Sequence, residues 1–257
     1  MFKINGLLRL AGAVAFATVT MGGVARADGE PGAAAAPAKE ERKFEWSLTM
    51  GATSDYIFRG ISSNNEDPAF QPSINASYGI FYAGLWGSNI TDPLNPWETD
   101  IYAGITPELG PVTFDFGIVY YWYPGADDSD TYEFKAGASF SPIKNLKLTP
   151  VFWYVPDQNN SVEVYTIEGT AAYELPACGI FTPTISGLVG YSEAPDGPAE
   201  GFFTGDVNSY TYWNVGLALA VENVTMDFRY WDTDIDTDVD QGLVDERFVF
   251  SMSVTVP

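Results

Sequence analysis

Apolar and polar side chains alternate one by one along most of this chain, and this period of two constrains its fold more than any other feature. Between residues 44 and 51, the apolar residues Phe44, Trp46, Leu48 and Met50 are separated by single polar or small residues. Neighbouring side chains of a β-strand point to opposite faces, whereas a helix would scatter such a pattern around its circumference. Similar alternation runs through residues 70–78, 112–122, 131–140, 224–230 and 247–256. The pattern therefore predicts an all-β protein.

The number of expected strands indicates a closed barrel. Less regular runs at residues 81–90, 97–106, 146–155, 162–174, 180–191 and 209–221 bring the total to about 12 strands. An even number of strands is typical of bacterial outer-membrane barrels. The alternation slips between Val162 and Ile167, which indicates either a bulge or a wrongly placed strand start there. We predict a transmembrane, antiparallel, up-and-down β-barrel over residues 43–257.

The connections between these strands alternate in length, as they do in outer-membrane barrels, where short periplasmic turns and longer extracellular loops follow one another. Short turns are expected at residues 78–80, 107–111, 141–145, 175–179 and 222–223. Longer loops are expected at residues 60–69, 90–97, 124–130, 156–161, 192–208 and 232–245. This order places both termini of the barrel chain in the periplasm.

Tryptophans are also sorted along the strands. Six of the seven lie at or near strand ends beside the longer loops: Trp86, Trp97, Trp122, Trp153, Trp213 and Trp231. Indole rings settle where hydrocarbon meets lipid headgroups, so we interpret these residues as an interfacial girdle. A soluble β-sandwich would show the same period of two. It has no reason to sort its connections by length or its tryptophans by strand end, so the barrel is the favoured interpretation.

The amino-terminal segment predicts export. Lys3 and Arg9 precede an apolar stretch of about 15 residues that ends at the small-residue triplet 25–27. This pattern is typical of a cleaved signal peptide, here residues 1–27, whereas the alternative of a transmembrane helix needs roughly 20 apolar residues. Residues 28–42 are rich in alanine and proline and predict a flexible leader. The expected location is the outer membrane of a Gram-negative bacterium.

Composition excludes several classes of function. Cleavage of the signal peptide would remove three of the 12 Lys and Arg and none of the 34 Asp and Glu, changing the net charge from −22 to −25. Nucleic acid is excluded as a partner, because phosphate binding requires a basic surface. With no histidine and the single cysteine Cys178, the chain also lacks the residues for Ser-His-Asp or Cys-His catalysis and for His-ligated metal sites. We therefore expect a protein that is not an enzyme and has no cofactor.

Four stretches of the sequence resemble a known family. They are residues 54–62 (SDYIFRGIS), 65–71 (NEDPAFQ), 114–117 with 120–124 (FDFG and YYWYP) and 245–251 (DERFVFS). Together they resemble the TorF family of Gram-negative porins. The resemblance covers nearly all of the mature chain, and the first stretch is its most specific part. It implies an outer-membrane barrel with a channel function.

The alternation turns eight charged side chains towards the barrel interior, and these are the candidate pore-lining residues: Asp55, Arg59, Asp100, Asp115, Glu133, Lys135, Asp227 and Arg229. Charges that face a water-filled lumen select solutes by charge and size. Tyr82, Trp86 and Tyr121 also point inward by parity and would narrow the lumen. The expected function is passive diffusion of small solutes, with weak cation selectivity that arises from the acidic outer loops.

A plugged lumen is the alternative to an open one. The inward charges could instead pair with one another, because small barrels are filled by their own side chains. The protein would then be a structural or surface-interaction barrel of the outer membrane without transport activity. The decisive observation is whether Arg59, Asp115 and their neighbours close the lumen.

An acidic stretch in the last long loop is a second candidate site. Asp234, Asp236, Asp238 and Asp240 supply the oxygen ligands that bind Ca²⁺ or Mg²⁺. The stretch is not an EF-hand, because neither register has both Gly at position six and Glu at position twelve. A solvated acidic loop is the simpler alternative to weak metal binding. Divalent ions also bridge lipopolysaccharide phosphates, so the expected partners are outer-membrane lipid, lipopolysaccharide and small solutes.

Overall fold

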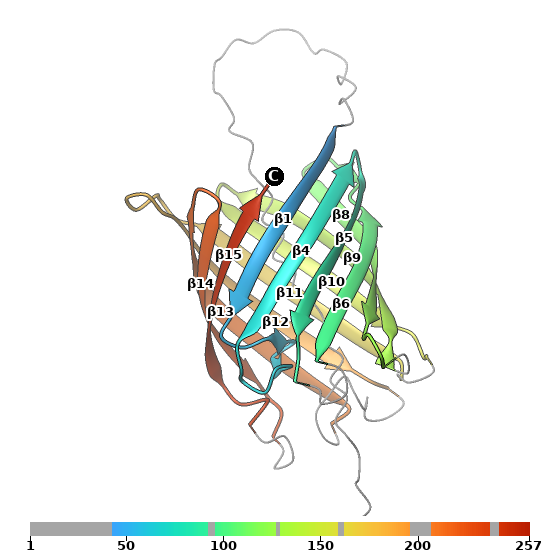
Figure 1. The fold of residues 1–257 in the computed structure, drawn as a ribbon. Helices are drawn as coiled ribbons and strands as arrows, with labels where there is room; N and C mark the ends of the chain where they lie inside the picture. Colours follow the sequence, from blue (N-terminus) through green and yellow to red (C-terminus); the bar gives the residue numbers. More distant parts are fainter. Residues whose placement is uncertain (1–42, 92–95, 127–128, 159–161, 196–206, 237–241) are drawn as a thin grey trace, which may run out of the picture.

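The computed structural model describes residues 43–91, 96–126, 129–158, 162–195, 207–236 and 242–257, which form a β-barrel (Figure 1). Its wall consists of β1 (Phe44–Thr53), β4 (Ala69–Tyr78), β5 (Phe81–Asn89), β6 (Trp97–Ile105), β8 (Val112–Trp122), β9 (Thr131–Ile143), β10 (Leu146–Val155), β11 (Val164–Glu174), β12 (Thr182–Glu193), β13 (Ser209–Val221), β14 (Val224–Thr233) and β15 (Arg247–Val256). Three two-residue strands are β2 (Ile57–Phe58), β3 (Ile61–Ser62) and β7 (Glu108–Leu109). The described residues include no helix with the length and apolarity that spanning a bilayer requires.

Each of the twelve wall strands pairs with its neighbour in antiparallel fashion, and the ring closes without a free edge. The first and last strands, β1 and β15, are joined from Leu48↔Val256 to Thr53↔Ser251. The two-residue strand β7 lies in the turn between β6 and β8, which pair directly with each other. Closure satisfies the backbone hydrogen bonds that lipid cannot. The predicted transmembrane up-and-down barrel is confirmed, and all twelve predicted strands are present.

The strand pairing decides between the two explanations of the slip near Val162. It is a misplaced strand start, because β11 begins at Val164 and then pairs regularly with β10 from Val155↔Val164 to Leu146↔Tyr173. The register shift lies instead between β9 and β10, at Leu146 and Leu148. The first long connection is also longer than predicted, since it spans residues 54–68 and contains β2 and β3. The alternation of short and long connections is otherwise as predicted.

Large apolar side chains face outward from the barrel wall. Phe116 is 46% exposed, Ile74 45% and Val215 55%, and each lies in the middle part of a wall strand. Such an apolar outer face suits hydrocarbon, whereas the inner face of a barrel of this type is polar. The chain begins β1 and ends β15 at the same end of the barrel, the end with the short turns (Figure 1). Residues 1–42 lie outside the described residues, so the signal peptide and the leader remain predictions.

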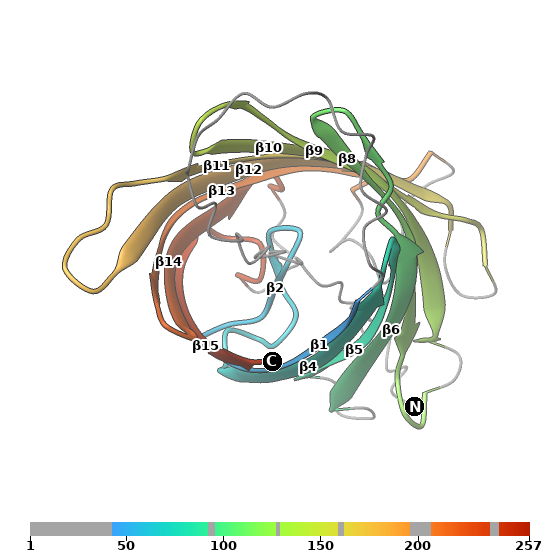
Figure 2. The ribbon, with the colours of Figure 1, turned by 90° about the horizontal axis from the view of Figure 1, so that it is seen from above.

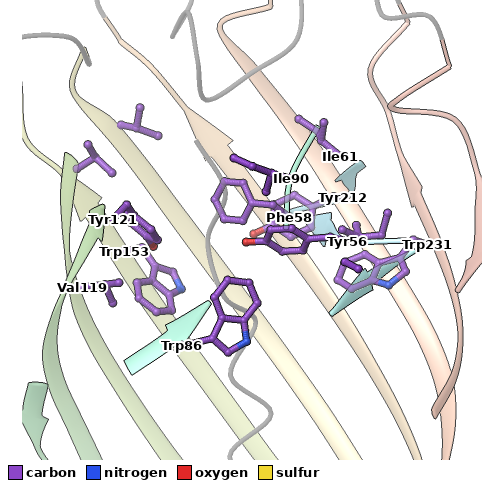
Figure 3. Packing of buried hydrophobic residues seen from close by; sticks show 14 of the residues in the cluster. Tyr56, Phe58, Ile61, Trp86, Ile90, Val119, Tyr121, Trp153, Tyr212 and Trp231 are labelled. Atoms are coloured by element: carbon purple, nitrogen blue, oxygen red, sulfur yellow. The ribbon is translucent and has the colours of Figure 1, made fainter. Parts of the chain in front are cut away.

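The prediction that these tryptophans form an interfacial girdle is only partly correct. Trp122 faces outward and is 41% exposed, but Trp86, Trp153 and Trp231 are 7–9% exposed and point into the barrel. There they join a buried cluster with aromatic residues of β2, β8 and β13 (Figure 3). Strand parity explains the difference, since it turns these three indoles to the inner face. Their place near the long loops therefore reflects a core inside the barrel rather than contact with headgroups.

Candidate functional site

The connection after β1 folds into the lumen instead of outward. Figure 2 shows β2 inside the ring of wall strands, so we call residues 54–68 the inner loop. A two-residue turn at Arg59 and Gly60 joins β2 to β3, with φ values of 48° and 86°. Positive φ at both positions is the geometry of a type I′ hairpin turn. Asp55 and Arg59 thus reach the interior through this loop, which corrects their predicted place on the faces of wall strands.

Gly60 fits closely against the barrel wall. A Cβ atom at this position would lie 2.5 Å from Thr233 Cγ2 and 2.8 Å from Tyr212 Cβ. Both distances are shorter than any normal carbon–carbon contact. The tip of the inner loop therefore rests on β13 and β14 with no space for a side chain, and glycine meets both this constraint and the positive φ.

Arg59 forms the centre of a buried polar network. Its Nη2 donates to Glu133 Oε1 on β9 at 2.6 Å, and the side chains are 4% and 0% exposed. Tyr121 donates to the other oxygen of Glu133 at 2.9 Å. The guanidinium also lies 4.7 Å from the Phe58 ring centroid and 5.7 Å from that of Trp153. Removing one partner of such a buried pair would cost about 3–5 kcal/mol, so the network holds the inner loop in place.

A second ion pair fastens the base of the inner loop. Asp55 accepts from Arg247 Nη1 at 3.0 Å and from the Ser62 hydroxyl at 2.8 Å. Arg247 also pairs with Glu66 at 3.2 Å. Burial raises the pKa of Asp55, and the hydrogen bonds from Ser62 and Arg247 act against that shift. Arg247, which begins β15, thus offsets part of the cost of burying this carboxylate and ties the loop to the last strand.

Carboxylates of β6 and β11 accept hydrogen bonds from aromatic residues of the inner loop, of the connection after β8 and of two wall strands. Glu98 accepts hydroxyl bonds from Tyr56 and Tyr123, both at 2.9 Å. Glu168 accepts from Tyr212 at 2.7 Å and from the Trp153 indole at 2.8 Å. Sequence reasoning missed both glutamates. Parity could have identified Glu98, which lies two positions before Asp100, whereas the slip near Val162 concealed the inward face of β11.

The lumen is more accessible to water at the end with the short turns. Lys135 pairs with Asp115 at 2.5 Å, and these side chains are 13% and 22% exposed. Arg229 pairs with Asp227 at 2.8 Å, with 19% and 22% exposure, and also donates to Asn214 and Ser186. Tyr82 points inward as predicted and donates to Asp115 at 2.7 Å. All eight predicted charged residues therefore face the interior, four around the inner loop and four towards the short turns.

The predicted metal-binding loop is only partly described. Asp238 and Asp240 lie outside the described residues. Asp234 and Asp236 are exposed, and Asp234 Oδ1 accepts from the Thr211 backbone at 2.6 Å. No group of three potential ligand residues occurs in the described part of the chain. Weak calcium or magnesium binding by this loop stays a prediction.

The fold is similar to that of solved outer-membrane porins. Against a structure of the NanC porin, the TM-score is 0.56 at 11% identity, and the likeness covers 83% of this chain and 100% of that chain. Against the KdgM porin, the TM-score is 0.55 at 10% identity, covering 82% and 98%. At such low identity, the likeness shows a shared barrel fold.

Sequence comparison supplies the family. No curated protein matches this chain. Residues 37–256, most of the chain, match the family described as "Bacterial protein of unknown function (Gcw_chp)". That description does not carry the name TorF, so the resemblance to TorF porins stays a prediction. The chain belongs to the Gcw_chp family of bacterial proteins.

Proposed function

We propose that this protein is a non-enzymatic channel of the outer membrane through which small solutes diffuse passively. The polar and charged inner face supports the proposal, as does the apolar outer face that surrounds it. The shared fold with the NanC and KdgM porins is consistent with it. Outer-membrane lipid and lipopolysaccharide would be its surroundings, and small solutes its cargo.

The observation that carries the proposal is the position of the inner loop. It leaves the wall at β1 and contacts β9 through Arg59, β6 through Tyr56, and β13 and β14 through Gly60. It therefore lies across the lumen between opposite parts of the wall. On this proposal the loop sets the size limit of the pore, while the charged pairs near the short turns line its wider half.

A plugged, structural barrel is the second candidate. The near-complete burial of Arg59, Glu133 and Tyr121 favours it, because solvent has almost no access to these side chains. Planar-bilayer recordings separate the two candidates. A channel gives reproducible conductance steps from the folded wild-type protein, whereas a plug gives none until the inner loop is displaced.

Weak cation selectivity is expected if the channel conducts. The chain carries 34 acidic and 12 basic residues, so cations should concentrate at its mouths. Reversal potentials across a salt gradient should show a small cation preference at 0.1 M salt. The preference should decrease at 1 M salt, because the Debye length falls from about 10 Å to about 3 Å. Anion preference at low salt would contradict this electrostatic argument.

The orientation in the membrane can be tested separately. We expect the loop between β14 and β15 at the cell surface and the turn that contains Lys144 in the periplasm, because longer loops are extracellular in such barrels. Epitope tags inserted near Asp238 and at Lys144 should be detected on intact cells only at the first site. Surface detection at Lys144 alone would invert the topology.

A further inference from the structure

Asp100 is a buried carboxylate that projects inward from β6 and is 0% exposed. No N–H or hydroxyl group in the described residues donates to its oxygens, and its side-chain hydrogen-bond contact is with the carboxyl of Glu98. An ionised carboxylate in such a place is strongly unfavourable unless a partner compensates its charge. The described residues supply no ion pair to Asp100. A proton or a bound cation is therefore needed.

Asp100 also interacts electrostatically with two other buried carboxylates, Glu98 and Glu133. Glu98 lies two positions away on the same face, about 6.6 Å along the strand. Each oxygen of Glu98 accepts a tyrosine hydroxyl, and those of Glu133 accept Arg59 and Tyr121.

The charge of this carboxyl pair decides what Asp100 needs. The third carboxylate, Glu133, is already paired with the guanidinium of Arg59, so no basic side chain is left to compensate Asp100 and Glu98 in the described residues. A proton on Asp100 would neutralise Asp100 alone, whereas a cation would also offset the charge of its neighbour.

We infer that Asp100 and Glu98 together bind a hydrated divalent cation of the Ca²⁺ or Mg²⁺ class inside the barrel. Both ions prefer oxygen ligands, and Mg²⁺ is commonly held by one or two carboxylates and several water molecules. The site is separate from the acidic loop, and its occupancy does not depend on whether the barrel conducts.

Aromatic residues next to the site make it measurable. In the strand register, Asp100 pairs with Trp86 on β5 and with Tyr121 on β8. Terbium ions occupy calcium sites and luminesce when a nearby indole or phenol absorbs the exciting light. Terbium bound at Asp100 should therefore report on this position.

The test uses the purified, folded barrel in detergent free of lipopolysaccharide. We expect sensitised terbium emission that Ca²⁺ or Mg²⁺ displaces, and a melting temperature that rises with either ion, because a ligand of the native state stabilises it. Asp100→Asn should abolish both effects. Asp227→Asn, which changes another inward carboxylate, should retain them. The combined Asn replacement of Asp234, Asp236, Asp238 and Asp240 should also retain them.

Glu98→Gln provides a second variant if Asp100→Asn does not fold, and it should weaken ion binding at least several-fold. Emission that persists in Asp100→Asn and disappears in the loop variant would assign the ion to the acidic loop and overturn the inference. Wild-type protein without displaceable emission would overturn it as well, leaving a proton shared between Asp100 and Glu98.

Discussion

Replacing Gly60 with valine is expected to raise single-channel conductance several-fold, or to create conductance where the wild-type protein shows none. The new side chain would collide with Thr233 and Tyr212, since even a Cβ atom would lie 2.5 Å and 2.8 Å from their nearest atoms. A β-branched residue is also strained at a φ of 86°. Both effects disfavour the seated inner loop, so the loop should leave the lumen.

Gly110→Val is the matched control for this experiment. Gly110 also has a positive φ, of 60°, but a Cβ atom there would meet nothing within 4 Å. It lies in the turn between β6 and β8, so the control reproduces the backbone strain without the clash. Unchanged conductance in Gly60→Val, with folding confirmed by circular dichroism, would show that the inner loop does not limit the pore.

Glu133→Gln is expected to release the inner loop by leaving Arg59 buried without its counter-charge. Breaking one side of a buried ion pair costs about 3–5 kcal/mol. The barrel wall does not need to unfold to relieve this cost, because the loop can open locally. A thiol reagent should therefore modify a Ser63→Cys reporter, made with Cys178→Ser, at least about 100-fold faster. Ser63 is 3% exposed in the seated loop, so slow labelling of the parent protein is expected.

Two further variants distinguish loss of the Arg59–Glu133 ion pair from a nonspecific effect of changing a charged residue inside the barrel. Asp115→Asn removes a partner of Lys135 in the more exposed half of the lumen, and it should leave labelling at position 63 nearly unchanged. Arg59→Met combined with Glu133→Gln removes both charges and should restore much of the protection, since neither charge of the pair is left buried without its partner. Fast labelling in that double variant would mean that the pair does not hold the loop.

The sequence by itself determined the wall of the barrel. Alternation within each strand is a local property of the pleated backbone, so Phe116 could be assigned outward and Asp115 inward from their neighbours alone. The length of each connection indicated the order of short turns and long loops in the same way. Even the inward direction of Trp86 follows from parity, although its position near a loop had suggested the membrane interface.

Only the tertiary structure decided what fills the lumen. Arg59 meets Glu133 across 74 residues, and Asp55 meets Arg247 across 192. No local sequence pattern predicts either pairing, because the partners come together only when the ring closes and the loop folds inward. The hairpin turn at Arg59 and Gly60 is too short to show alternation, and its direction depends on the space beside Tyr212. The face to which each strand side chain points can be read from its neighbours in the sequence. The filling of the lumen depends on side chains that are distant in the sequence and come together in one enclosed space.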